Sequence, residues 1–140
     1  MQLSERQQEI IDEFHFFESW MDKYQYLIDL GKELAPLNPS EMNDANLVRG
    51  CQSNVWMLTE GDADNMIIRA TSDAAIVSGL IALVIRLYSG ASAQEIVQTK
   101  PDFIGAIGLS QHLSPTRANG LASMLTRVKS EAIKKVAANQ

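Results

Sequence analysis

Apolar residues recur every three or four positions along the first quarter of the chain, which is the spacing of an amphipathic helix. Ser4-x-x-Gln7 resembles a capping box at a helix start. Ser19-x-x-Asp22 resembles a second start, so the pattern predicts two helices, over residues 4–17 and 20–34. The apolar positions are Ile10, Phe14, Phe17, Met21, Tyr24, Leu27 or Ile28, and Leu34.

The pattern changes after these helices, where prolines and short polar side chains exclude a further helix. Pro36 and Pro39 lie among several asparagine and aspartate residues. Two short apolar runs follow, over residues 55–58 and 66–71, and the polar residues 61–65 between them are typical of a turn. We expect an antiparallel hairpin, with residues 47–49 as a third, short strand.

The second half of the chain reads as helical. Residues 74–88 are apolar almost all round, which predicts a central helix capped by Ser72-Asp73 and ended by Gly90. Short helices are expected from Ser92-x-x-Glu95 to Pro101 and over residues 102–109. Ser114-Pro115 is a favourable start for a last helix. That helix presents one apolar face, made of Leu121, Leu125, Val128, Ala132 and Val136.

This order of elements predicts a single α+β domain over residues 1–140, a small antiparallel three-stranded sheet packed with helices. The length and the 46% hydrophobic content suit one globular core. A net charge of −5 argues against a nucleic-acid binder. The N-terminus has no pattern of a signal peptide, and residues 74–87 are too short and interrupted to span a bilayer. A single cysteine favours a reducing compartment, so we expect a cytoplasmic protein.

That cysteine, Cys51, is the main candidate for chemistry. It follows Gly50, which permits a sharp turn next to the thiol. A buried, inert cysteine in a helical interaction protein is the alternative. A thiol hydrolase needs a histidine base and an orienting partner, yet the chain offers only His15 and His112. Structural zinc and iron–sulfur clusters need about four ligands, which argues against a metal site. No phosphate-binding glycine motif is present.

Three blocks of sequence, in order, resemble the SufE family of sulfur acceptors, which includes the CsdE-like proteins. The first is Leu47-Val-Arg-Gly-Cys-Gln-Ser-Asn-Val-Trp56, the second runs over residues 72–82, and the third runs over residues 109–121. The opening helices, with Lys23-Tyr-Gln-Tyr26, are also similar. The likeness covers nearly the whole chain, and Cys51 lies at the position that bears the persulfide in that family.

The resemblance implies an α+β fold shared with the IscU scaffold. It also implies that a PLP-dependent cysteine desulfurase of the SufS or CsdA type passes sulfur to Cys51 and is stimulated by the carrier. The sulfur then goes to an iron–sulfur assembly scaffold such as SufBCD. On this reading the chain is a carrier without a cofactor or metal of its own, since PLP belongs to the desulfurase. The alternatives are an IscU-like scaffold and a thiol-dependent hydrolase.

The resemblance also suggests roles for residues around the thiol. Cys51 must react as a thiolate, and Arg117 is a candidate to stabilise it, unless it is only a surface arginine. Asp73 is either a helix cap or a contact for the partner. We further expect the loop to alternate between a sheltered and an extended state, with Gly50 as a hinge and a shelter formed by Leu47, Val48, Val55 and Trp56. The residues expected around the loop or at the partner are Gly50, Gln52, Ser53, Asp73 and His112.

Overall fold

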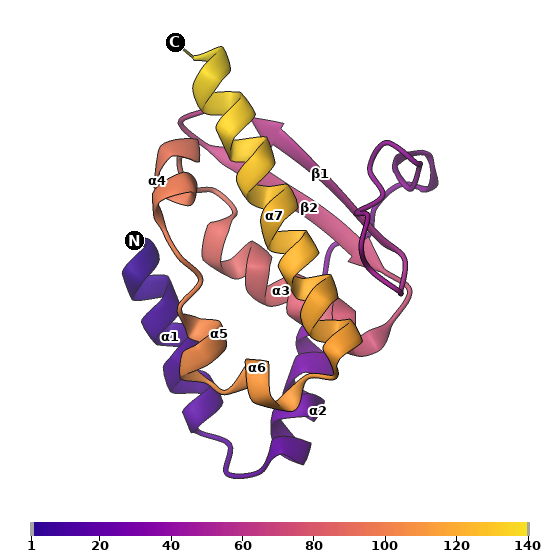
Figure 1. Ribbon diagram of the computed structural model, residues 1–140, viewed down its shortest axis with the longest axis vertical. Coiled ribbons are helices and arrows are strands. Elements are labelled where there is room, and N and C mark those ends of the chain that lie inside the picture. The colour runs from indigo at the N-terminus through magenta and orange to yellow at the C-terminus, as the bar shows by residue number, and fades with distance from the viewer. Residues whose placement is uncertain (1, 140) are drawn as a thin grey trace.

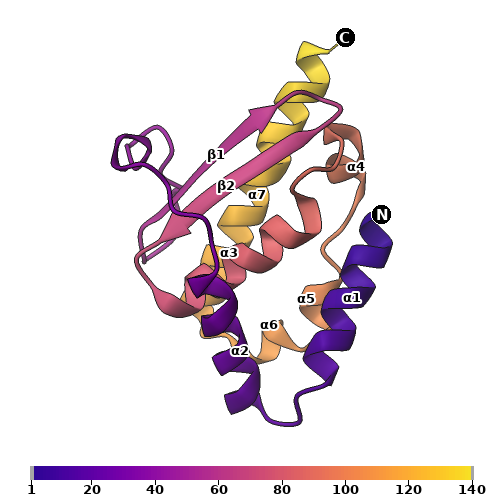
Figure 2. The ribbon, with the colours of Figure 1, turned by 180° about the vertical axis from the view of Figure 1, so that it is seen from behind.

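The structure, a computed structural model, describes residues 2–139 and has an α+β architecture around one β-hairpin (Figures 1 and 2). The strands are β1 (Val55–Gly61) and β2 (Met66–Ser72). The longest helix, α7, lies on one face of the hairpin, in front of the strands in Figure 1 and behind them in Figure 2. The helices are α1 (Leu3–His15), α2 (Trp20–Lys32), the 3-10 turn η1 (Pro39–Glu41), α3 (Ala75–Tyr88), α4 (Ala93–Gln98), α5 (Phe103–Ala106), α6 (Leu109–His112) and α7 (Pro115–Ala138).

Three predicted helix starts are confirmed. Ser19, Ser92 and Ser114 each accept a hydrogen bond from the backbone N–H three residues later, which caps α2, α4 and α7. The first predicted helix is present as α1, but its capping box at Ser4 is wrong, because the N-cap residue is Gln2, which makes no side-chain cap. Gln7 is instead buried, where its amide donates to the carbonyl of Lys100 and accepts from the N–H of Phe103.

The predicted three-stranded sheet is wrong, because the sheet has two strands. β1 and β2 pair antiparallel from Val55 opposite Ser72 to Gly61 opposite Met66. Leu47 makes only a single bridge to Trp56. The pairing stops there because the chain turns sharply at Gly50, whose φ of +95° lies outside any strand conformation. The expected third strand is therefore the base of a loop.

Helix α3 is central, as its apolar sequence predicts, and contacts α1, α2, α7 and β2. Its buried side chains belong to one continuous hydrophobic core that also takes in Phe14, Met57 and Met124. The helix predicted over residues 102–109 is present only as the short α5, because Gly108 adopts a φ of +81°, and α6, which follows that glycine, was not predicted from the sequence. Within residues 2–139, no helix combines the length and the apolar character that crossing a membrane requires.

Candidate functional site

Cys51 lies at the tip of a short closed loop, residues 49–54, which we call the Cys51 loop. The backbone N–H of Val48 donates to the carbonyl of Val55 at 2.8 Å, so the two ends of the loop are tied together. The chain enters from the bridge at Leu47 and leaves directly into β1. The thiol therefore belongs to a loop of six residues whose two ends are joined by backbone hydrogen bonding.

The loop rests on one face of α7. The thiol of Cys51 donates a hydrogen bond to the carbonyl of Gly120 at 3.5 Å. Next to it, Gly50 has a positive φ, and a β-carbon there would overlap the hydroxyl of Ser123. The positive φ favours glycine at position 50, and any larger residue would also have to displace the Ser123 hydroxyl.

A small cavity lies beside the thiol, between α3 and α7. Its volume of about 20 Å³ has room for roughly one water-sized group. The cavity has a largely apolar wall from the two helices and a polar edge from the loop and the start of α7. Its lining residues are Cys51, Gln52, Ser53, Val77, Leu80, Thr116, Arg117, Gly120, Leu121 and Met124.

The residues expected to shelter the thiol are not the ones that surround it. The apolar side chains that line it come from Val77 and Leu80 of α3 and from Leu121 and Met124 of α7, rather than from the strand residues flanking the loop. Val48 and Val55 belong to the same hydrophobic core but do not line the cavity. The sequence marks these helix residues only as apolar, so their place beside Cys51 follows from how α3 and α7 pack.

Burial raises the pKa of the Cys51 thiol above its ordinary value. At neutral pH the docked cysteine is thus less ionised than an exposed one. Because the thiolate is the reactive form, this shift lowers the reactivity of the thiol in the observed position of the loop.

Asp73 fastens the outgoing half of the Cys51 loop. Its carboxylate accepts hydrogen bonds from the backbone N–H of Asn54 at 3.2 Å and from the side-chain amide of Asn54 at 3.0 Å. The predicted helix-capping role of Asp73 is wrong, since α3 has Ala74 at its N-cap without a side-chain bond. The hydroxyl of Ser72 accepts from the N–H of Ala74 just before the helix.

Some of the other predicted site residues lie at the Cys51 cavity, and one lies away from it. Gln52, Ser53 and Arg117 come together at the cavity, and Arg117 is exposed there in the first turn of α7. His112 lies elsewhere, at the end of α6, where its ring stacks on that of Trp20 with centroids 3.9 Å apart. The hydroxyl of Tyr24 donates to the carbonyl of His112. His112 thus joins α6 to α2 and does not line the Cys51 cavity.

We expect Asp73→Ala to speed the alkylation of Cys51 by iodoacetamide several-fold. The substitution removes both bonds to Asn54, each a hydrogen bond to a charged group, so the loop leaves its docked position more often. Asp73→Asn keeps an acceptor for the backbone N–H and should lie between the wild type and Asp73→Ala. An alkylation rate for Asp73→Ala equal to that of the wild type would show that Asp73 does not restrain the loop.

Comparison with known proteins places this chain in a family. Residues 8–132 match the SufE family model, described as an Fe-S metabolism associated domain. An uncharacterised SufE-like protein of Rhizobium meliloti is 46% identical over 129 residues, which are 89% of this chain and 92% of that protein. A second uncharacterised SufE-like protein, from Rhizobium etli, is 43% identical over 135 residues, 93% of this chain and 91% of that protein.

The fold has a solved counterpart as well. The solution structure of a hypothetical protein from Thermus thermophilus superposes with a TM-score of 0.77, covering 94% of this chain and 96% of that chain. Its sequence is 18% identical, so this likeness concerns the fold. The family model covers most of the chain and both Rhizobium relatives match along nearly their whole length, so the protein belongs to the SufE family, whose domain is associated with iron–sulfur metabolism.

Proposed function

We propose that this protein is a sulfur carrier that accepts sulfur on Cys51 from a PLP-dependent cysteine desulfurase of the SufS or CsdA type. It then delivers the sulfur to an iron–sulfur assembly scaffold such as SufBCD. It stimulates the desulfurase by taking the persulfide sulfur from the desulfurase cysteine. The observation that carries the proposal is the placement of the chain's one thiol, in a short tethered loop beside a small cavity, in a member of the SufE family.

The proposed transfer is an exchange between sulfur atoms. The Cys51 thiolate attacks the outer sulfur of a persulfide on the desulfurase cysteine, and a new sulfur–sulfur bond forms on Cys51. The old sulfur–sulfur bond breaks, and the desulfurase cysteine leaves as a thiolate. The proton of the Cys51 thiol passes to solvent or to the desulfurase, and no external oxidant or reductant is consumed.

The docked and extended positions of the loop would serve different steps. In the docked position, the cavity beside Cys51 has space for about one added atom, and its walls would keep water and oxidants from the bound sulfur. In the extended position the thiol would leave the apolar surroundings that raise its pKa. The desulfurase would favour this position by binding it more tightly than the docked one.

Arg117 is our candidate for stabilising the thiolate during transfer. Its side chain is exposed at the edge of the cavity, in the same turn of α7 that faces the loop. A guanidinium near a thiol favours the ionised form and lowers its pKa. In the docked loop the effect of burial prevails, so Arg117 would act once the thiol has moved toward solvent.

The test is direct sulfur loading. The protein is incubated with L-cysteine and a desulfurase of the SufS type or the CsdA type, and its intact mass is measured. We expect one added sulfur atom on the wild-type chain, removable by a thiol reductant, together with faster desulfurase turnover. An unmodified chain in the presence of both active desulfurases would contradict the proposal.

A further inference from the structure

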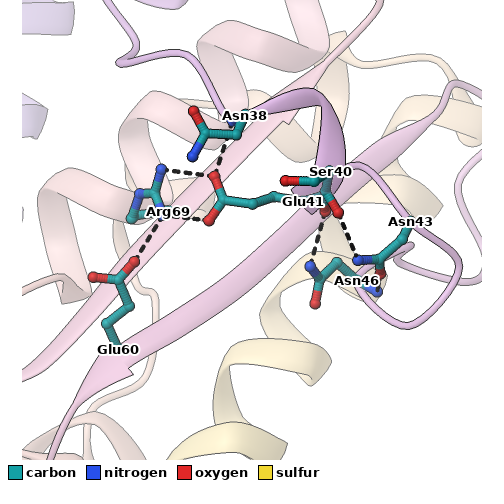
Figure 3. A network of polar contacts seen from close by, with 7 residues as sticks. All are labelled: Asn38, Ser40, Glu41, Asn43, Asn46, Glu60 and Arg69. Atoms are coloured by element: carbon teal, nitrogen blue, oxygen red, sulfur yellow. Dashed lines mark hydrogen bonds and ion pairs between the residues drawn. The ribbon is translucent and has the colours of Figure 1, made fainter.

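The chain just before the Cys51 loop, residues 38–47, is held from two sides. We call this stretch the entry segment. On the sheet side, the guanidinium of Arg69 on β2 pairs with both carboxylate oxygens of Glu41, at 2.6 and 3.0 Å, and with Glu60 of β1 at 2.7 Å (Figure 3). Within the segment, the side-chain amide of Asn46 donates to the carbonyl of Glu41 at 2.8 Å (Figure 3). The segment is thus folded on itself and fastened to the hairpin.

On the other side, α7 holds the last part of the entry segment through Arg127. The guanidinium of Arg127 donates to the carbonyl of Ala45 at 3.1 Å and to that of Leu47 at 3.4 Å. Its Nε also pairs with Glu131 one turn later, at 3.2 Å. The side chain is about three-quarters buried, with 25% of its surface exposed. Two backbone carbonyls and one carboxylate therefore use the donors of this guanidinium.

The geometry of the bridge explains why the carbonyl of Leu47 faces α7 and not β1. In the antiparallel bridge, the carbonyl of Asn46 accepts from the N–H of Met57, and the N–H of Val48 donates to Val55, both at 2.8 Å. Leu47 lies in the bridge between these two bonds, so its own carbonyl points away from β1, and the carbonyl of Ala45 belongs to the turn that precedes the bridge. Arg127 binds both carbonyls and joins the bridge to the helix.

The contacts of α7 with this region follow one face of the helix. Gly120 accepts from the thiol, Ser123 packs against Gly50, and Arg127 binds the carbonyls before the loop. These three positions are three and four residues apart, the spacing of one helix face. One face of α7 therefore contacts both the moving part of the loop and its base.

We propose that Arg127 is a positioning residue that fixes the base of the Cys51 loop, so that residues 49–54 move while the bridge at Leu47 stays in place. The inference rests on the proposed sulfur transfer for its biological meaning. It also sets a limit on that transfer. Cys51 is three residues from Val48, so its backbone can extend about 10 Å from the base. The desulfurase must bring its own cysteine within that reach.

Hydrogen exchange of single amides tests this role. In Arg127→Met, which keeps a long apolar side chain but donates nothing, we expect the N–H groups of Val48 and Met57 to exchange about tenfold faster. Alkylation of Cys51 by iodoacetamide should also accelerate. The matched control is Glu131→Gln, which loses the ion pair of Arg127 but leaves its bonds to the two carbonyls. It should leave both amides within about twofold of the wild type.

The amides of α3 distinguish a local effect from a global one. If Arg127 positions the loop base, exchange at Leu83 and Val84 in the core stays unchanged in Arg127→Met. Unchanged exchange at Val48 and Met57, or an equal increase at all four amides, would overturn the proposal. These readouts need no desulfurase. A chain that shows the expected exchange pattern but takes no sulfur would contradict the proposed function alone.

Discussion

Replacing Cys51 with serine is expected to abolish sulfur loading completely. A serine hydroxyl has nearly the same size as the thiol, so it fits the site beside α7 and can still donate to the carbonyl of Gly120. It is not ionised at neutral pH and forms no sulfur–sulfur bond, so it cannot take over the transferred atom. Intact mass after incubation with desulfurase and L-cysteine measures the loss, and circular dichroism should show an unchanged fold.

A relocated thiol provides the matched control for this loss. The double variant Cys51→Ser, Ser130→Cys also carries one cysteine, placed at an exposed position of α7 outside the cavity lining. We expect it to remain unloaded, because the desulfurase must receive the thiol on the Cys51 loop. Loading of this variant at the wild-type rate would show that any accessible thiol suffices. Loading of the single variant Cys51→Ser would refute Cys51 as the acceptor.

Replacing Gly79 with alanine is expected to cause a large loss of stability, although it adds only one methyl group. α2 and α3 cross closely at Gly31 and Gly79. A β-carbon on Gly79 would overlap the carbonyl of Leu27 and lie 2.6 Å from its carbonyl carbon. Because these are backbone atoms of a packed helix, the two helices must separate. We expect a loss of about 1–3 kcal/mol in the free energy of unfolding, and a fall in Tm of roughly 3–10 °C.

Gly105→Ala is the control for this prediction. Gly105 lies in α5, and a β-carbon there would have no atom within 4 Å. Alanine also restricts the unfolded chain more than glycine does, so the free energy of unfolding should stay the same or rise slightly. Thermal unfolding followed by circular dichroism compares the two variants. Equal Tm values for Gly79→Ala and the wild type would show that the crossing can widen without cost.

The sequence by itself determined the features that depend on neighbours within a few residues. The caps at Ser19, Ser92 and Ser114 join a side chain to a backbone N–H three positions later, so the pattern of residue types is enough to predict them. The hairpin of β1 and β2 follows from two apolar runs around a polar turn. The single cysteine and the three blocks around it likewise indicated the SufE family, which the family model confirms.

The tertiary structure determined the hydrogen-bond partners of polar side chains that bind residues far away in the sequence. Asp73 could have capped its own helix, yet it binds Asn54 across the end of the sheet. Gln7 could have closed a capping box, yet it binds Phe103, 96 positions away. A local pattern lists the donors and acceptors within reach, but it does not say which distant groups packing will bring closer.

The same limit applies to the site around the thiol. The sequence singled out Cys51, but the walls of its cavity come from α3 and α7, and the base of its loop is held by Arg127, 80 positions from Leu47. The expected third strand failed because the left-handed turn at Gly50 and the close contact with Ser123 draw the chain off the sheet. Local residue types singled out the thiol, and the packing of distant helices determined which groups surround it.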